Sequence, residues 1–473
     1  MSLKKGVEVT LTISGAAFKG KGVGKHEGMA VFVTGTAPGD VVRARVIKKK
    51  KSYCEAKLLE IIEPSPDRIT PKCQHADVCG GCSWQHLPYN KQAEYKGEQV
   101  KEHIQRIAGL KETIVHPTLP CDQPFYYRNK MEYSFATRRW LTEEEINREE
   151  FVDDSGLAAG LHAPGRFDKI LNLNECHLQR SESYEILDFV RNYCLENDLP
   201  AFDHFKHEGY MRHVMIRNSQ HTDDFMVNLV TYRDEPETVQ KLADALLEAF
   251  PIITTIVNNI NDTSSPTSIG RIEKVIYGSG FIVDHIGKHS FKIHPNAFFQ
   301  TNSLQAEKLY AIARDYAEIK QDNIVYDLYC GVGTLSLFVS EPAKKVLGIE
   351  LVDVAVKNAK FNAIENKVNN VSFIKGDMKD VFTQEVVDEF GAPDVLITDP
   401  PRVGMHPDVV KRLCELKVPR IVYVSCNTST MARDLKELAE VYDVIEVQPV
   451  DMFPQTYHVE AVAKLVLKTA SVE

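Results

Sequence analysis

The sequence predicts a mixed α/β protein in three parts, of which the last is a Rossmann-like domain. From about residue 291, segments typical of strands alternate with segments typical of helices, which predicts a parallel sheet with helices on both faces. Residues 1–66 contain short strands between glycine-rich turns, which favours a small closed barrel of the oligonucleotide-binding (OB) type. Residues 67–290 mix both patterns and are expected to form an α+β central domain. A chain of 473 residues is long enough for three domains.

In the N-terminal part, apolar and polar residues alternate along the segments expected to form the barrel. Val42, Ala44 and Val46 alternate with arginines, so one face of this strand should be buried and the other solvated. Residues 64–66, Pro-Ser-Pro, are expected to link the barrel to the next domain. The barrel strands are expected at residues 7–13, 30–34, 40–47 and 56–62.

Charge is unevenly distributed along the chain. The formal net charge is −10, but residues 1–72 carry 14 Lys and Arg against 7 Asp and Glu. This asymmetry indicates a basic appendage on an acidic catalytic body, with a nucleic acid as the partner of the basic part. A solvated basic face without a partner is the alternative.

The central part begins with an expected helix at residues 91–108, where Tyr95, Val100 and Ile104 recur at helical spacing. Basic and aromatic side chains are interleaved at residues 138–140, which suits single-stranded RNA and equally an ordinary strand pair. Further elements are expected as strands at residues 126–135, 211–217 and 225–231 and as a helix at 238–250.

The C-terminal part starts with an expected helix at residues 304–319 and a strand at 324–328. A glycine turn follows, and another helix is expected from about Thr334. The remaining strands are expected at residues 345–349, 371–374, 394–398, 420–425 and 460–467.

The glycine turn, residues 327–334 (DLYCGVGT), lies between a strand and a helix, where glycine lets the backbone approach a ligand closely. A dinucleotide-binding fingerprint would have a third glycine at the position of Ser336, so S-adenosylmethionine fits better than NAD or ATP. Glu350 ends the next strand, 19 residues after Gly331, and is placed to accept hydrogen bonds from a ribose. Asp377, after the following strand, is a candidate for an adenine contact and equally for a loop cap.

Residues 399–402 (DPPR) fall at the carboxyl end of the fourth strand, where open α/β sheets bind ligands. Methyltransferases that act on amino groups often have an aromatic residue after such prolines, and here Arg402 occupies that place. The sequence therefore favours a carbon atom as the methyl acceptor.

A thiol and a carboxylate near the C-terminus fit this chemistry. Carbon 5 of uracil becomes nucleophilic only after a thiolate has added to carbon 6, and Cys426 follows a predicted strand, as a nucleophile should. The proton on carbon 5 must later be removed, and Glu460 is the carboxylate placed to act as this general base.

Three cysteines, Cys73, Cys79 and Cys82, fall within ten residues, and Cys176 is a candidate fourth ligand. Sulfur ligands in this number suit tetrahedral zinc or an iron–sulfur cluster, and spacing alone leaves both open. The remaining five are expected to be ordinary cysteines: Cys54, Cys121, Cys194, Cys330 and Cys414.

Residues 291–473 closely resemble the RNA uracil-C5 methyltransferases. The motifs that carry this resemblance lie at residues 298–302 (FFQTN), 327–333, 399–402, 425–427 (SCN) with 432–434 (ARD), and 451–460 (DMFPQTYHVE). It implies Cys426 as nucleophile and Glu460 as proton acceptor. It also implies contacts to S-adenosylmethionine, made by Gln300, Tyr329, Glu350 and Asp399. Thr428, where many members have Pro, and residues 455–457 depart from the family pattern without touching the proposed catalytic atoms.

The resemblance extends to the other two parts of the chain. The basic N-terminal part is similar to the TRAM domain, an RNA-binding OB barrel, and the cysteine spacing is that of members with a [4Fe–4S] cluster, with Cys176 as the fourth ligand. It also implies that helix 91–108 packs on the catalytic domain. TRAM and cluster cysteines together resemble most the enzymes that act on 23S rRNA, with tRNA uridine as the alternative substrate. Cytosine-C5 methylation and a non-enzymatic, cluster-carrying RNA-binding protein are more distant alternatives.

The chain contains no stretch of 18 apolar residues and its first residues lack an apolar signal core, so we expect a cytoplasmic protein without a membrane anchor. No obligate protein partner is inferred.

Overall fold

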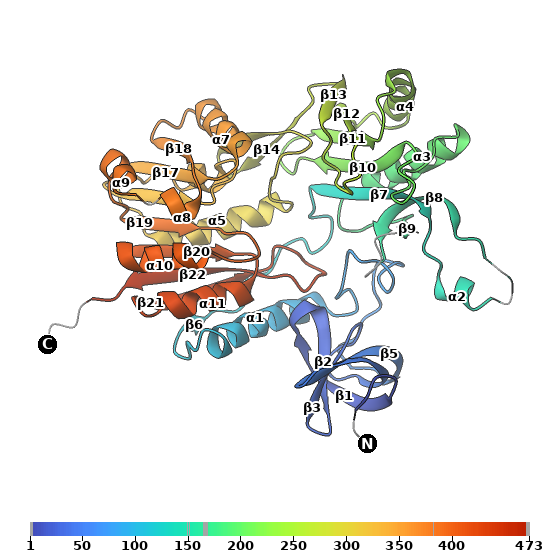
Figure 1. The fold of residues 1–473 in the computed structure, drawn as a ribbon, viewed down its shortest axis with the longest axis horizontal. Coiled ribbons are helices and arrows are strands. Elements are labelled where there is room, and N and C mark those ends of the chain that lie inside the picture. Colours follow the sequence, from blue (N-terminus) through green and yellow to red (C-terminus); the bar gives the residue numbers. More distant parts are fainter. Residues whose placement is uncertain (1–2, 149, 151, 164–168, 382, 470–473) are drawn as a thin grey trace.

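The computed structural model describes residues 3–148, 150, 152–163, 169–381 and 383–469. A small barrel lies at the N-terminus, a mainly antiparallel sheet forms the central part, and a large mixed sheet with helices on both faces forms the C-terminal part (Figure 1). The predicted fold class is confirmed. No helix of the described residues has the length and apolar character needed to cross a membrane.

The N-terminal part is a closed five-stranded barrel in the order β1-β2-β3-β5-β4. The alternation seen in the sequence sets its core, because Val42, Ala44 and Val46 are buried. The strand β2 was not expected. Its Gly22 and Gly24 approach neighbouring strands so closely that a Cβ atom would lie 2.1 Å from the Thr36 hydroxyl and 2.3 Å from a backbone oxygen. The strands are β1 (Glu8–Ala17), β2 (Lys21–His26), β3 (Met29–Val33), β4 (Val41–Lys49) and β5 (Tyr53–Glu63).

The central part is a seven-stranded sheet in the order β13-β12-β11-β10-β7-β8-β9. The strand expected at 126–135 begins only at Lys130. Tyr126 has a left-handed backbone conformation with φ of 58°, and the N–H groups of Arg128 and Asn129 donate to loop carbonyls instead of a neighbouring strand. The elements are β7 (Lys130–Arg138), β8 (Ser155–His162), β9 (Ile170–Asn172), β10 (Met211–Asn218), β11 (Phe225–Thr231), β12 (Thr255–Ile260) and β13 (Ile272–Tyr277), with helices α2 (Glu143–Ile146), α3 (Ser181–Glu196) and α4 (Pro236–Ala249).

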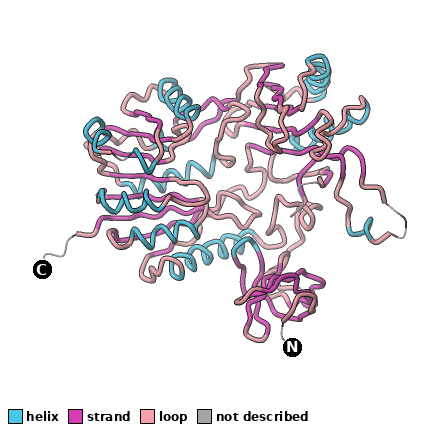
Figure 2. Tube along the Cα trace, viewed as in Figure 1, coloured by secondary structure: helices cyan, strands magenta, loops and turns pink. Residues whose placement is uncertain are grey.

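The C-terminal sheet has eight strands in the order β18-β17-β16-β19-β20-β22-β21-β6. Its first five strands are parallel, as predicted, whereas β22 runs antiparallel to both β20 and β21. Figure 2 shows helices on both sides of these strands. The strands are β16 (Ile324–Leu328), β17 (Lys345–Glu350), β18 (Val371–Lys375), β19 (Val395–Thr398), β20 (Arg420–Ser425), β21 (Tyr442–Val450) and β22 (Glu460–Leu467). The helices are α5 (Ser303–Ala317), α6 (Thr334–Phe338), α7 (Asp353–Glu365), α8 (Met378–Val381), α9 (Gln384–Phe390), α10 (Pro407–Leu416) and α11 (Thr428–Leu438).

Two segments from the central region pack on this C-terminal sheet. The helix α1 (Tyr89–Arg106) buries Val100 and Ile104 in the same core as the α11 residues Met431 and Leu435 (Figure 1). The strand β6 (Ile114–Val115) pairs in parallel with the edge strand β21. The hairpin formed by β14 (Ile282–Ile286) and β15 (His289–Ile293) shares a core with α5.

A buried ion pair fastens α1 to the loop between β21 and β22. The Lys96 ammonium donates a hydrogen bond of 2.6 Å to Asp451, and both side chains have no exposed surface. Lys96 also donates to the backbone oxygen of Phe453 at 3.1 Å. Burial lowers the pKa of Lys96, and the attraction of Asp451 opposes this effect. Two buried charges in this geometry depend on each other, because either one alone would be left unpaired.

Replacing Lys96 with Met should therefore destabilise the loop at residues 451–458 by about 3–5 kcal/mol, since the Asp451 carboxylate loses its partner while it stays buried. Hydrogen exchange of the loop amides measures this loss. Lys357→Met, which breaks the exposed pair with Asp353, is the matched control and should leave the exchange unchanged. Equal exchange rates in the wild-type protein and in Lys96→Met would contradict the expectation.

Candidate active site

The strand register brings the predicted nucleophile and base together. β20 and β22 are antiparallel, with Ser425 opposite Ala461. Cys426, directly after β20, and Glu460, the first residue of β22, therefore lie at the same sheet edge although they are 34 positions apart in sequence. Asp399 follows β19, the strand next to β20, and reaches the same edge.

Cys426 lines an open pocket with about 480 Å³ of empty space, part of it continuous with solvent. Residues from five segments of the chain form its wall, including Lys19 of the barrel and Gln99 of α1. The remaining lining residues follow β19, follow β20 or precede β22: Arg402, Asn427, Thr428, Tyr457, His458 and Val459. The side chain of Asn427 caps α11 and donates a hydrogen bond of 2.8 Å to the backbone oxygen of Arg402, so the two loops are held together.

The thiol and the carboxyl groups of this edge influence one another. The pKa of the Cys426 thiol is raised to about 11, mainly by burial and further by Glu460 and Asp399, whereas Arg402 acts in the opposite direction. Burial also raises the pKa of Glu460 to about 7, again opposed by Arg402. The pKa of Asp399 is raised well above its usual range by burial and by Glu460. The positive charge of Arg402 thus favours the ionised forms of both the Cys426 thiol and the Glu460 carboxyl group.

A second pocket lies at the glycine turn and has about 410 Å³ of empty space, part of it continuous with solvent. Three of the residues expected to contact S-adenosylmethionine line it, namely Gln300, Tyr329 and Asp399. Gly331 has a positive φ of 55° and leaves open space where a Cβ atom would stand, so a ligand can approach the backbone there. Asp399 lines this pocket and Cys426 lines the other, and the two residues follow the neighbouring strands β19 and β20, so the two pockets lie side by side at this sheet edge.

The other two expected cofactor residues lie outside this lining. The Glu350 carboxylate accepts backbone hydrogen bonds from Gly331 at 3.1 Å and Val352 at 2.9 Å, so it holds the glycine turn. Asp377 accepts a hydrogen bond of 3.2 Å from the backbone N–H of Lys379, which is the loop-cap role weighed against the adenine contact.

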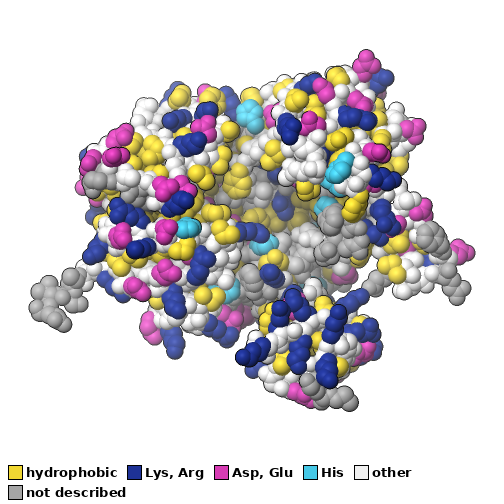
Figure 3. All heavy atoms as spheres, viewed as in Figure 1, with side chains coloured by type: hydrophobic (Ala, Val, Ile, Leu, Met, Phe, Trp, Pro, Cys, Tyr) yellow, Lys and Arg dark blue, Asp and Glu magenta, His cyan; other side chains and the backbone are white. Residues whose placement is uncertain are grey.

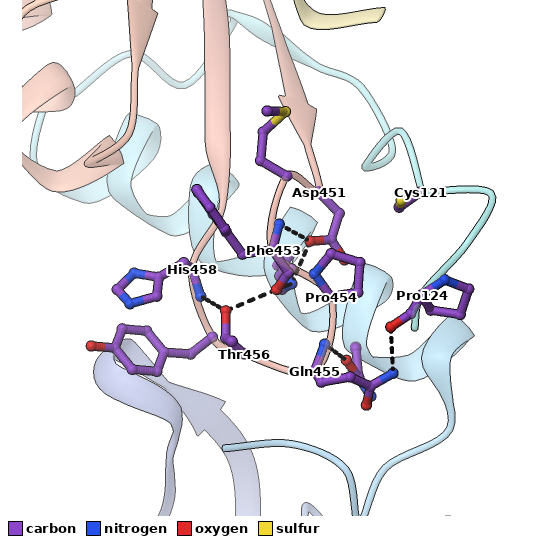
Figure 4. Close-up of polar contacts among 12 residues, drawn as sticks. Cys121, Pro124, Asp451, Phe453, Pro454, Gln455, Thr456 and His458 are labelled. Atoms are coloured by element: carbon purple, nitrogen blue, oxygen red, sulfur yellow. Dashed lines mark hydrogen bonds and ion pairs between the residues drawn. The ribbon is translucent and has the colours of Figure 1, made fainter. Parts of the chain in front are cut away.

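The loop before β22 has its own network of polar contacts (Figure 4). Asp451 accepts from the backbone N–H of Phe453 at 3.0 Å, and the Thr456 hydroxyl links the Phe453 carbonyl with the His458 N–H. Gln455 donates to the backbone oxygen of Pro124 at 3.3 Å. Burial lowers the pKa of His458 to about 4, so its imidazole is neutral at physiological pH. These hydrogen bonds hold the loop in place along residues 451–458, just before Glu460.

The four cysteines expected to hold a cluster are near one another and are largely buried. Burial raises the pKa of each, to about 12 for Cys73 and Cys82, and neighbouring thiols raise the pKa of Cys73, Cys79 and Cys82 further. Cys79 accepts a hydrogen bond from the Gly81 N–H at 3.3 Å, and Cys82 accepts one from Gln85 at 3.2 Å. Within the described ranges, no three His, Cys, Asp or Glu residues converge on a position for a single metal ion.

The cysteine segment, residues 73–84, is joined to the loop between β21 and β22. Directly after Cys82, the backbone N–H groups of Ser83 and Trp84 donate to the carbonyl of Gln455, at 2.9 and 3.1 Å. The Ser83 hydroxyl accepts from the N–H of Tyr457 at 3.1 Å. A change in the cysteine segment would therefore reach the pocket wall through these bonds.

Several pocket residues were not identified from the sequence. Phe298, which lines the glycine pocket and is 73% exposed, lies within a motif noted for its resemblance. Tyr457 and His458 lie in another such motif, and their rings are 4.2 Å apart. No sequence pattern marks Lys19 or Gln99 as a pocket residue, because only the packing of the barrel and of α1 brings them to the pocket.

Comparison with protein families identifies two regions of the chain. Residues 270–468 match the tRNA (uracil-5-)-methyltransferase model, and residues 3–59 match the TRAM domain. An RNA methyltransferase of Bacteroides thetaiotaomicron is 42% identical over 96% of this chain and 100% of its own length. An RNA methyltransferase of Chlorobaculum tepidum is 40% identical over 97% of this chain and 96% of its own length.

Among solved structures, the Pyrococcus abyssi tRNA (uracil-54, C5)-methyltransferase in complex with S-adenosyl-L-homocysteine is similar over 97% of this chain and 100% of its own. The two share 29% identity with a TM-score of 0.75. With the barrel, the sheet order and the paired Cys426 and Glu460, these matches lead to one conclusion. The chain belongs to the RNA uracil-C5 methyltransferases that carry a TRAM domain and use S-adenosylmethionine.

Proposed function

We propose that this enzyme methylates carbon 5 of a uridine in 23S rRNA through a covalent adduct with Cys426, and that Glu460 is the general base. The observation that carries the proposal is the antiparallel register of β20 and β22, which sets thiol and carboxylate at one edge between two adjoining pockets. The glycine pocket would hold the methyl donor and the pocket of Cys426 the target base. A uridine must leave its base stack to enter that pocket.

The reaction begins at the thiol. The Cys426 thiolate adds to carbon 6 of the uracil, and the electrons of the 5,6 double bond move onto carbon 5 and oxygen 4 as an enolate. Because burial holds the thiol pKa near 11, the ring must meet a thiol that is activated within the complex. Arg402 supplies part of this activation, since its charge lowers the thiol pKa.

Methyl transfer and release complete the cycle. S-adenosylmethionine supplies an electrophilic methyl group when it is bound. Carbon 5 of the enolate takes this methyl group and keeps its proton. The Glu460 carboxylate then removes that proton, the 5,6 double bond forms again, and the bond between carbon 6 and Sγ breaks to release Cys426. The buried position of Glu460 suits this role, because its pKa of about 7 lets it both take up and release a proton near neutral pH.

For the donor, we propose contacts from Gln300, Tyr329 and Asp399, which line the glycine pocket. Glu350 would act at the ribose, since its carboxylate oxygens lie beside the glycine turn and each can accept a second hydrogen bond. Asp377 is retained as the adenine contact, in addition to its capping bond.

For the cysteine group, we propose that Cys73, Cys79, Cys82 and Cys176 hold a [4Fe–4S] cluster, with zinc as the alternative. The thiols of Cys79 and Cys176 are buried and those of Cys73 and Cys82 partly buried, and the N–H···S hydrogen bonds to Cys79 and Cys82 suit a donor set, since such bonds stabilise ligating thiolates. The sulfur ligands of a cluster lie further apart than those of a single metal ion, which suits cysteines that do not converge on one position among the described residues. We assign the cluster a structural role, as a brace for the loop between β21 and β22 through Ser83 and Trp84.

The choice of 23S rRNA rests on the combination of the TRAM barrel with the cluster cysteines. tRNA is the second candidate, because the tRNA-modifying Pyrococcus abyssi enzyme is similar over its full length. We divide the chain at residues 1–66, 67–290 and 291–473. The packing of α1 and the β14–β15 hairpin ties parts of the central segment closely to the catalytic one.

Incubation with methyl-labelled S-adenosylmethionine and unmodified rRNA or tRNA, separately, tests the function. We expect labelled 5-methyluridine from the ribosomal RNA. Label from tRNA alone would move the substrate to the second candidate. Labelled 5-methylcytidine, or no labelled nucleoside from either RNA, would contradict the proposal.

In the Glu460→Gln variant, Cys426 should still add to carbon 6 of the uracil and carbon 5 should still be methylated. The proton on carbon 5 should then not be removed. The covalent protein–RNA adduct should then accumulate and be visible on a denaturing gel, with methyl label in the band. Cys426→Ala should give neither adduct nor product. A Glu460→Gln enzyme that releases 5-methyluridine at the wild-type rate would show that another group is the base.

Because a general base must be deprotonated, resolution of the wild-type adduct should speed up as the pH rises through about 7 and level off above it. Arg402→Gln removes the charge that lowers the pKa of Glu460, so the midpoint of the pH–rate curve should move to higher pH. Arg402→Lys keeps a positive charge and should leave this midpoint near the wild-type value. Single-turnover decay of the adduct measures both. A midpoint unchanged in Arg402→Gln would contradict this assignment.

Anaerobically purified protein should be brown, with broad visible absorbance and about four iron atoms per chain. Cys79→Ser should lose iron and increase hydrogen exchange at residues 451–458, because the brace is lost. Cys194→Ser, a buried cysteine of α3, is the matched control and should keep the iron. A colourless wild-type protein that contains zinc would overturn the cluster assignment.

A further inference from the structure

The turn between the first two barrel strands forms part of the catalytic pocket. This turn, η1 (Phe18–Gly20), joins β1 to β2, and its Lys19 lines the same pocket as Cys426. Lys19 is exposed and has a φ of 67°, a left-handed conformation that is uncommon for a residue with a side chain. Such conformations persist where the surrounding structure holds them, and they occur often at functional sites.

The turn is held by Trp84 and by Tyr457 of the loop before β22. The backbone oxygen of Gly20 accepts a hydrogen bond of 3.3 Å from the indole N–H of Trp84. A Cβ atom on Gly20 would lie 3.0 Å from the ring of Tyr457, and φ at this position is +70°. Trp84 and Tyr457 also share a small apolar cluster with Ala37 of the barrel. The position of Lys19 is thus set by the same loop that leads to Glu460.

The Lys19 ammonium is available to a ligand. Its neighbour Lys21 is paired with Glu55 at 2.6 Å, whereas Lys19 has no ion pair or side-chain hydrogen bond to any described residue. Figure 3 shows many Lys and Arg side chains on the barrel and a hollow between it and the rest of the molecule.

Lys19 differs from Arg402, the other cation of the pocket. Arg402 contributes to the pKa of both Cys426 and Glu460, whereas Lys19 is not among the groups that shift either. Lys19 enters the pocket from the barrel turn, whereas Arg402 enters it from the loop after β19. A nucleotide whose base reaches Cys426 carries its negative charge on the flanking phosphates, outside the base pocket.

We infer that Lys19 binds a phosphate next to the target uridine and thereby positions the extruded nucleotide over Cys426. This inference rests on the proposed function. It makes Lys19 a positioning residue and gives the barrel a role beyond general affinity, because one of its turns completes the pocket in which the base is modified.

A substrate cycle tests this inference. It compares wild-type enzyme and Lys19→Ala on the RNA that the wild-type enzyme methylates, with either natural phosphates or neutral methylphosphonates on both sides of the target uridine. On natural RNA, Lys19→Ala should lower kcat/KM about 10- to 100-fold, as expected for a charge-assisted hydrogen bond. On the neutral RNA, the wild-type enzyme should lose a similar factor, and Lys19→Ala should lose nothing further.

Three further variants complete the test. Lys19→Gly relieves the left-handed backbone and should behave like Lys19→Ala, and Lys19→Arg should restore most of the activity. Lys50 is an exposed barrel lysine outside the pocket lining. The Lys50→Ala variant should therefore lose as much kcat/KM on the neutral RNA as the wild-type enzyme does. If neutral phosphates lower the kcat/KM of Lys19→Ala by the same factor as that of the wild-type enzyme, Lys19 does not act on those phosphates. That result would overturn this inference and leave the proposed function standing. A wild-type enzyme that methylates no uridine would overturn the proposed function, and the inference with it.

Discussion

The buried ion pair between Lys96 and Asp451 is the constraint on which the catalytic geometry depends. It joins a helix that precedes the central sheet to the loop between the last two strands. That loop leads directly into Glu460, the first residue of β22, which the strand register places at the same sheet edge as Cys426. Neither charge can leave the other without a large free-energy cost, because both side chains are wholly buried. The loop is thus held before any substrate arrives, as a preorganised site requires.

Three separate regions of the chain meet at this loop. α1 holds it through Lys96, the cysteine segment through Ser83 and Trp84, and the barrel through Gly20 and Tyr457. The pocket of Cys426 is consequently a product of the whole chain. This arrangement gives a physical reason for a barrel and a cysteine group in an enzyme whose proposed chemistry needs only a thiol, a base and a methyl donor.

The sequence predicted those features that depend on local pattern. The parallel strands, the glycine turn and the barrel strand around Val42 each carry a periodicity or a turn signal, and the positions of Cys426 and Glu460 follow from strand ends. The sequence could not predict β2, where close contacts require glycine, or β6, which is too short to show a pattern. Lys96 looks like any polar residue of an amphipathic helix, since its partner is 355 positions away.

The central claim, that Cys426 forms a bond to carbon 6 of a uridine, is tested most directly with RNA that contains 5-fluorouridine. Fluorine cannot be removed from carbon 5 as a proton, so the wild-type enzyme should remain bonded to the methylated ring. Peptide mass mapping of the trapped complex should find the modified nucleotide on Cys426, and only when S-adenosylmethionine is present. A trapped nucleotide on another residue, or no trapped complex from an RNA that the enzyme methylates, would contradict the account.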